Sequence, residues 1–117
     1  MIKFKNQVYT STSEIFFEHF NDRYKLRIIW YLKNETLRFK DLLEVLQPLT
    51  KKTLTIKLKE LEELNLINRE VFAEVPPRVE YSLSEHGKAL EPVIDEILVW
   101  SQKYAKTFAQ MIERRSR

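Results

Sequence analysis

The chain of 117 residues contains no cysteine, a single glycine and only four prolines. Without cysteine it cannot form a disulfide, use a thiol as a nucleophile or build a zinc finger. The single glycine excludes the glycine-rich loops, of the GxGxxG and Walker types, that hold nucleotide phosphates. Turn-forming residues are also too few for an all-β sandwich or barrel. The sequence therefore predicts a mainly helical protein.

Long apolar runs are absent as well. No stretch approaches the roughly 18 consecutive apolar residues of a membrane span, and the first residues, MIKFKNQVYTSTSE, lack the apolar region of a signal peptide. We therefore expect a cytoplasmic protein with no membrane partner.

No pattern of catalytic or metal-binding residues is recognisable. The two histidines, His19 and His86, lie too far apart in the sequence to suggest a pair of ligands. No nucleophile, base and orienting group occur at a familiar spacing. We expect no metal, no cofactor and no enzymatic activity.

The composition fits one folded domain. Hydrophobic residues make up 44% and charged residues 32% of the chain, which is incompatible with wholesale disorder. We expect a single domain over residues 1–117, with an N-terminal arm (1–10), a core (11–83) and a C-terminal helical region (84–117). The net charge of +3 suits an anionic partner or solubility alone, so the distribution of charge must decide between them.

The first half of the chain predicts short helices. Ser11 and Glu14 have the spacing of a capping box, with Thr12 and Ser13 as competing N-cap residues. Asn21-Asp22 marks a break and a new cap before a second helix that ends near Asn34. Apolar residues from Phe39 to Leu46 repeat at helical spacing up to Pro48.

A more polar helix follows over about 50–64, with Thr50 as its cap. Its first half is basic, and its acidic residues come only in the second half. The lysines of this helix are Lys51, Lys52, Lys57 and Lys59. Such a cluster is either a solvated face or a surface for an anion.

From residue 67 the apolar period changes to two, which predicts a β-hairpin over about 67–83. Its loop contains Pro76-Pro77-Arg78. Two prolines favour a stiff, extended loop, so we expect Arg78 to be presented at its tip.

The C-terminal region predicts a long helix that begins after Ser84 and is kinked or split at Pro92. Apolar residues recur on one stripe of this helix, and such a stripe needs a partner surface. We expect it to form a dimer interface through Leu90, Ile94, Ile97, Tyr104, Phe108 and Met111.

This order of elements is that of a mainly α winged helix-turn-helix with a small β-hairpin and an extra C-terminal helix. In that architecture the basic helix enters the major groove of DNA and the hairpin lies against the flanking backbone. Lysines can neutralise phosphates, and threonine hydroxyls can reach bases or phosphate oxygens.

Several segments resemble the HxlR-type transcriptional regulators. They are YKLRII from Tyr24, LRFKDL from Leu37, TLT from Thr53, LKELE from Leu58 and EVPPRVEYSL from Glu74. The resemblance implies a homodimeric, sequence-specific DNA-binding regulator whose terminal helices form the dimer interface. Tyr24, Asn21-Asp22 and Asn65 stand where the family usually has tryptophan, a glycine pair and glycine. Some members sense oxidants through an N-terminal cysteine, which this chain lacks.

Position by position, the resemblance places Ile56 and the polar residues around it on the recognition helix, Arg78 on the wing and Arg38 just before the short helix. The predicted DNA-binding residues are Arg38, Thr50, Lys51, Lys52, Thr53, Thr55, Lys57, Lys59 and Arg78. The predicted partners are a second copy of the chain and double-stranded DNA with a pseudo-palindromic operator.

Two alternatives stay open. The first is a winged-helix adaptor that binds proteins and not DNA, although such surfaces usually centre on apolar anchors. The second concerns a set of aromatic residues that either pack in the core and interface or line a pocket for a small-molecule effector that the sequence does not identify. This set is Phe16, Phe17, Phe20, Tyr24, Trp30, Trp100, Tyr104 and Phe108.

Overall fold

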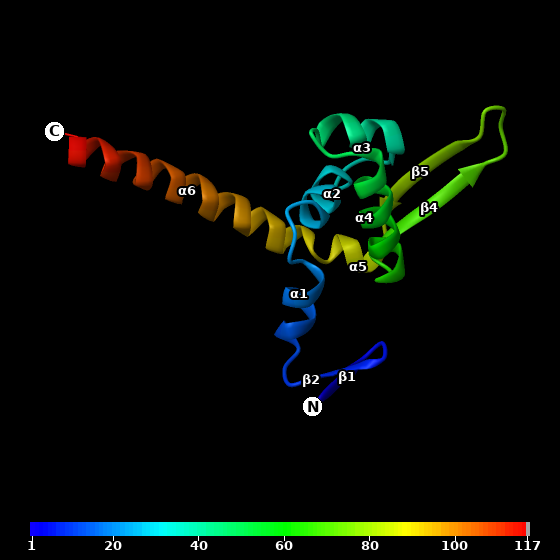
Figure 1. Ribbon diagram of the computed structural model, residues 1–117, viewed down its shortest axis with the longest axis horizontal. Coiled ribbons are helices and arrows are strands. Elements are labelled where there is room, and N and C mark those ends of the chain that lie inside the picture. The colour runs from blue at the N-terminus through cyan, green and yellow to red at the C-terminus, as the bar shows by residue number, and fades with distance from the viewer. Residues whose placement is uncertain (117) are drawn as a thin grey trace.

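In the computed structural model, which describes residues 1–116, a long C-terminal helix projects from one side of a helical body and a β-hairpin projects from the other (Figure 1). The elements in chain order are β1 (Ile2–Phe4), β2 (Gln7–Tyr9), α1 (Ser13–His19), α2 (Lys25–Tyr31), β3 (Leu37–Arg38), α3 (Phe39–Val45), α4 (Lys51–Glu63), β4 (Ile67–Phe72), β5 (Arg78–Leu83), α5 (Glu85–Lys88) and α6 (Glu91–Ser116). The principal extents are 62 × 42 × 24 Å, so the molecule is elongated.

The hydrophobic core lies where α2, α3 and α4 meet the base of a three-stranded antiparallel sheet. The strand order is β3-β5-β4, and the register pairs Ile67 with Leu83 and Leu37 with Tyr81. The fully buried side chains are Ile28, Ile29, Leu42, Leu46, Leu54, Leu58 and Leu61. This is the predicted winged helix-turn-helix, with β4 and β5 as the wing.

Local sequence signals set the two ends of α4, close to the bounds that the sequence predicted. The Thr50 hydroxyl accepts a hydrogen bond from the Thr53 N–H at 3.2 Å, which caps the first turn. At the other end Asn65 has φ = 59°, the left-handed conformation that asparagine tolerates better than most residues. The single glycine is also explained, because a Cβ on Gly87 would clash with the Leu66 carbonyl oxygen.

The predicted division of the C-terminal region at Pro92 is confirmed. Pro92 lies in the first turn of α6, where a missing N–H costs no helical hydrogen bond. Ile94, close behind it, is buried in the core, and the Lys33 ammonium pairs with the Asp95 carboxylate at 2.8 Å. The core therefore extends beyond the predicted boundary at residue 83.

The N-terminal region is more ordered than the sequence suggested. Residues 1–10 form the β1–β2 hairpin, in which Ile2 pairs with Tyr9 and Lys5 takes φ = 55° in the turn. The predicted Ser11–Glu14 capping box is wrong, because the Glu14 carboxylate accepts instead from the Thr10 N–H (2.9 Å) and hydroxyl (2.5 Å). These hydrogen bonds hold the pKa of Glu14 below its usual value.

The second predicted helix, now α2, ends at Tyr31 and not near Asn34. The following residues lead into β3, a two-residue strand paired with β5 that the sequence did not indicate. No helix within residues 1–116 is long and apolar enough to cross a membrane.

Candidate nucleic-acid interface

One face of α4 is buried and the opposite face is basic. Leu54, Leu58 and Leu61 point into the core, so the helical period turns the residues between them outward. Lys51, Lys52, Thr55, Ile56 and Lys59 are exposed. None of these lysines forms an ion pair within residues 1–116, so their charges are available to an anion.

The polarity of α4 adds to this charge. Its first turn carries Lys51 and Lys52 beside the positive end of the helix dipole, while its acidic residues lie in its second half. The Thr55 hydroxyl donates to the Lys51 carbonyl at 2.8 Å, which leaves its oxygen lone pairs able to accept. Thr50 and Thr53 bond to each other's side chains and are committed to the cap. The N-terminal half of α4 is therefore the surface best suited to phosphate.

Lys57 departs from the predicted pattern. Its ammonium lies 3.2 Å from an Asp22 carboxylate oxygen, and its side chain is only 20% exposed. It therefore faces the start of α2 and not the outer face of α4. The lysine pattern alone did not reveal this, because the acidic partner is distant in the sequence.

Arg38 lies at the end of β3, immediately before α3, and is exposed. Its N–H donates to the Asp41 carboxylate at 3.0 Å, which closes the first turn of α3. Like the exposed lysines of α4, its guanidinium makes no ion pair within the described residues.

The expectation that Arg78 stands free at the wing tip is wrong. Arg78 begins β5 and pairs in register with Phe72, so its guanidinium lies 4.0 Å from the centre of that ring. It also contacts the Glu74 carboxylate at 3.4 Å and the Glu80 carboxylate at 3.2 Å. Phe72 on the neighbouring strand and two carboxylates close to Arg78 in the sequence thus hold the guanidinium on the wing. The exposed tip is formed by residues 73–77.

A cation that the sequence did not single out lies beside α4. Arg69 on β4 is exposed and shares a groove of about 650 Å³ with Thr55 and Lys59 of α4. Glu62 and Glu63 line the same groove, so its basic part is the end nearer the start of α4. The antiparallel pairing of the wing strands brings Arg69 to this position. In the sequence, only the alternating pattern of residues 67–72 indicated which face of the strand Arg69 occupies.

The residues predicted for the dimer interface divide into two groups. Ile94 is buried in the chain's own core and is removed from the predicted interface, whereas Leu90 is partly buried against that core. Ile97, Tyr104, Phe108 and Met111 are exposed on α6. Beside them Trp100, a member of the predicted aromatic set, is 62% exposed and stacks on Tyr104, whose ring stacks in turn on Phe108.

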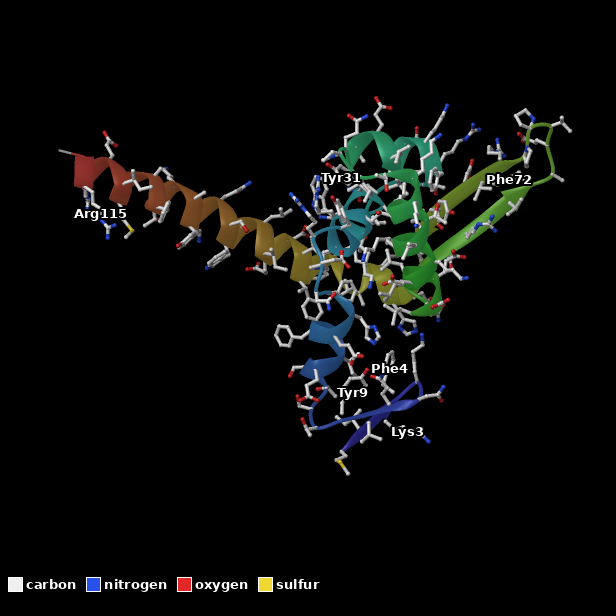
Figure 2. All side chains as sticks on the ribbon, in the orientation of Figure 1. Lys3, Phe4, Tyr9, Tyr31, Phe72 and Arg115 are labelled. Atoms are coloured by element: carbon white, nitrogen blue, oxygen red, sulfur yellow. The ribbon has the colours of Figure 1, made fainter. Side chains whose placement is uncertain are left out.

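The predicted aromatic set does not surround one pocket. Phe16 and Phe20 line a cavity of about 440 Å³ between α1 and α5, whereas Trp30 lines a separate one of about 290 Å³ between α2 and α6. Trp100, Tyr104 and Phe108 project from the exposed length of α6. Figure 2 shows the side chains along this length standing clear of the body.

His19 and His86 line the same cavity as Phe16, despite their separation in the sequence. No carboxylate joins them in the lining of that cavity, as far as the described residues show. Within residues 1–116 no group of three or more His, Cys, Asp or Glu is placed to hold a metal ion.

Comparison with known proteins gives a consistent result. A family model described as HxlR-like helix-turn-helix matches residues 20–109. The chain is 38% identical over 96 residues to an uncharacterised HTH-type transcriptional regulator of Methanothermobacter thermautotrophicus, covering 82% of this chain and 73% of the relative. It is 34% identical over 110 residues to the HTH-type transcriptional regulator YtcD of Bacillus subtilis, covering 90% and 87%.

Solved structures share the fold. The crystal structure of a regulator described as ytcD superposes with a TM-score of 0.78 at 35% identity, covering 83% of this chain and 99% of that one. A protein described as a transcriptional regulator of the MarR family from Porphyromonas gingivalis gives 0.77 at 31% identity, covering 84% and 96%. The redox regulator HypR in its reduced form gives 0.80 at 29% identity, covering 86% and 99%.

Both sequence relatives are described as HTH-type transcriptional regulators. HypR is described as a redox regulator, but redox chemistry at a thiol is impossible in this chain because it has no cysteine. With a family model that spans residues 20–109 and relatives above 30% identity over most of its length, the protein belongs to the HxlR-like helix-turn-helix family of transcriptional regulators.

Proposed function

We propose that the protein is a sequence-specific regulator that binds double-stranded DNA as a homodimer. In this proposal α4 enters the major groove, which is wide enough for an α-helix, and the β4–β5 wing lies on the flanking backbone or in the minor groove. The observation that carries the proposal is the outer face of α4, where Lys51, Lys52 and Lys59 are exposed and unpaired within the described residues.

The proposed contacts follow from the placement of each side chain. Lys51, Lys52, Lys59 and Arg38 are proposed to bind phosphates, and Thr55 to read a base. Thr50 and Thr53 act through the helix cap. Arg78 remains a proposed backbone contact, although its guanidinium must share its charge with Glu74 and Glu80. Lys57 is paired with Asp22 and is not among the proposed phosphate contacts.

The homodimer is supported by the exposed apolar face of α6. Apolar side chains from Ile97 to Met111 are exposed, and aromatic residues of this kind dominate buried interface area. A second copy with the same stripe would cover it by symmetry. A twofold dimer would place two α4 helices about 34 Å apart, one turn of DNA, which predicts a pseudo-palindromic operator.

The direct experiment is selection of bound fragments from the source genome, followed by sequencing and protection of the recovered sites. We expect a shared motif with twofold symmetry. Thr55→Ala should then change preference among bases at one position in each half-site, by about 1–3 kcal/mol if the hydroxyl reads a base. Arg78→Ala should weaken binding to all sequences by a similar factor. Recovery of no enriched motif would favour the adaptor alternative.

A further inference from the structure

A partly buried cluster of charges joins α4 to the junction between α1 and α2. Asp22 lies at the start of α2, where one of its carboxylate oxygens, Oδ1, accepts from the N–H groups of Tyr24 (2.7 Å) and Lys25 (3.0 Å). These hydrogen bonds fix the carboxylate to the backbone. Its other oxygen, Oδ2, is the one that lies near the lysine ammonium groups.

The ammonium of Lys25 fills the centre of the cluster. Lys25 is only 4% exposed, donates to the His19 carbonyl at 2.8 Å and contacts the Glu60 carboxylate on α4 at 2.5 Å. It lies 3.9 Å from Asp22 Oδ2. Because Glu60 is the nearer carboxylate, Lys25 leaves Asp22 Oδ2 largely unneutralised.

Lys57 supplies the missing charge. Its ammonium lies 3.2 Å from Asp22 Oδ2, and the two side chains are 20% and 18% exposed. Two lysines and two carboxylates make the cluster neutral as a whole. If Lys57 turned toward a phosphate, Asp22 Oδ2 would remain buried with only the distant Lys25, and an uncompensated buried charge is unfavourable.

We propose that Asp22 is a specificity-determining residue that withholds Lys57 from DNA, so that α4 presents three lysines to the duplex and not four. This rests on the proposed function. Removing one phosphate contact per protomer lowers the sequence-independent part of the affinity, while contacts to bases are unaffected. Asp22 therefore raises the ratio of specific to non-specific binding without touching DNA.

The test compares the salt dependence of binding to a random-sequence duplex of about 30 base pairs, long enough for two half-sites. The variants are Asp22→Asn, Lys57→Met, the double variant and Lys52→Met as the matched control on the outer face. Asparagine keeps an Oδ1 that can cap α2. If Asp22→Asn fails to fold, Asp22→Ser, which also caps helices, carries the same test.

Each phosphate contact contributes about 0.9 to the slope of log affinity against log salt, or about 1.8 for a dimer. We expect Lys52→Met to lower the slope by this amount and Lys57→Met to leave it unchanged. Asp22→Asn should steepen the slope by up to the same amount, and the double variant should return it to the wild-type value. An unchanged slope in Asp22→Asn, or a loss in Lys57→Met equal to that in Lys52→Met, would overturn the proposal.

A second readout separates this inference from the proposed function. If the wild-type protein binds no duplex at any salt concentration, the proposed function fails, but the pairing of Asp22 with Lys57 can still be measured by NMR titration of the Asp22 carboxyl. Lys57→Met should raise the pKa of Asp22. An unchanged pKa would mean that the pairing on which the inference depends is absent.

Discussion

The lysines of this protein differ in their surroundings, and their surroundings indicate whether each one stabilises the fold or is available to a ligand. The exposed lysines of α4 have no ion-pair partner within the described residues, whereas Lys25 is buried against the carboxylate of Glu60 and the carbonyl of His19. A buried ammonium whose partners are all satisfied holds elements together, and its loss leaves those partners unpaired. Lys25 is therefore a structural residue, and the outer lysines of α4 are the candidates for function.

We predict that Lys25→Met destabilises the protein by about 2–3 kcal/mol, because it removes charged hydrogen bonds from a buried site. Urea unfolding measures this. The matched control is Lys33→Met, whose ion pair with Asp95 is more exposed and should contribute less than about 1 kcal/mol. Equal losses in the two variants would contradict the structural role of Lys25.

Acid should weaken the same cluster. Burial opposes ionisation of Asp22, but the N–H groups of Tyr24 and Lys25 and the Lys57 ammonium outweigh it and hold its pKa below the usual value. A carboxyl with a lowered folded-state pKa stabilises the fold above its unfolded pKa, near 3.9, and this contribution is lost as the pH falls further toward the folded value.

The corresponding prediction is that Asp22→Asn reduces stability at neutral pH and that its deficit shrinks below about pH 4. Urea unfolding of both proteins across this pH range measures the difference. A deficit that stays constant down to about pH 2 would show that the Asp22 charge does not contribute to stability.

At the scale of elements, the sequence predicted best those features that arise from near neighbours in the chain. The cap at Thr50 and the division at Pro92 are local, and both are present. Features that depend on cross-strand or distant partners were missed. They include the contact of Arg78 with Phe72, the pairing of β3 and the ion pair between Lys57 and Asp22.

The N-terminal hairpin was missed for a related reason. Its strands have three residues each, too few for an alternating pattern to stand out, and its turn uses Lys5 at positive φ, where glycine or asparagine is the usual signal. The sequence also could not show that the apolar stripe of α6 is divided into a part buried in the chain's own core and an exposed part. A heptad repeat does not reveal where the helix leaves its own core, which happens here after Ile94.

The exposed part of α6 gives a prediction for this element. Phe108→Glu should convert the proposed dimer to monomer, because it places a charge in the centre of the apolar stripe. Gln102→Glu adds the same charge to an exposed position on another side of α6 and should leave the dimer intact. Sedimentation equilibrium distinguishes the two, and circular dichroism should show an unchanged winged body. A monomeric wild-type protein would contradict the assigned interface.

For the whole molecule, the shape and the charge distribution support one arrangement. α6 projects from the body on the side away from the wing (Figure 1), so a partner on α6 leaves the wing exposed. In a twofold dimer both α4 helices would face the same duplex. We therefore predict that Phe108→Glu weakens binding to a two-half-site operator far more than to a single half-site, because only the former depends on dimerisation. Fluorescence anisotropy with both duplexes measures this, and equal losses would contradict it.

The proposed function depends above all on phosphate binding by the outer lysines of α4. Its sharpest test is the affinity for duplex DNA between 50 and 200 mM salt, for the wild-type protein and for a variant with Lys51, Lys52 and Lys59 all changed to Met. If a dimer neutralises about 6–10 phosphates, wild-type affinity should fall by about 10³–10⁵-fold over this range. The triple variant should lose about 5 from the slope, at about 0.9 for each of its six lysines. A flat response in the wild-type protein, or equal slopes in the two proteins, would show that these lysines do not bind phosphate.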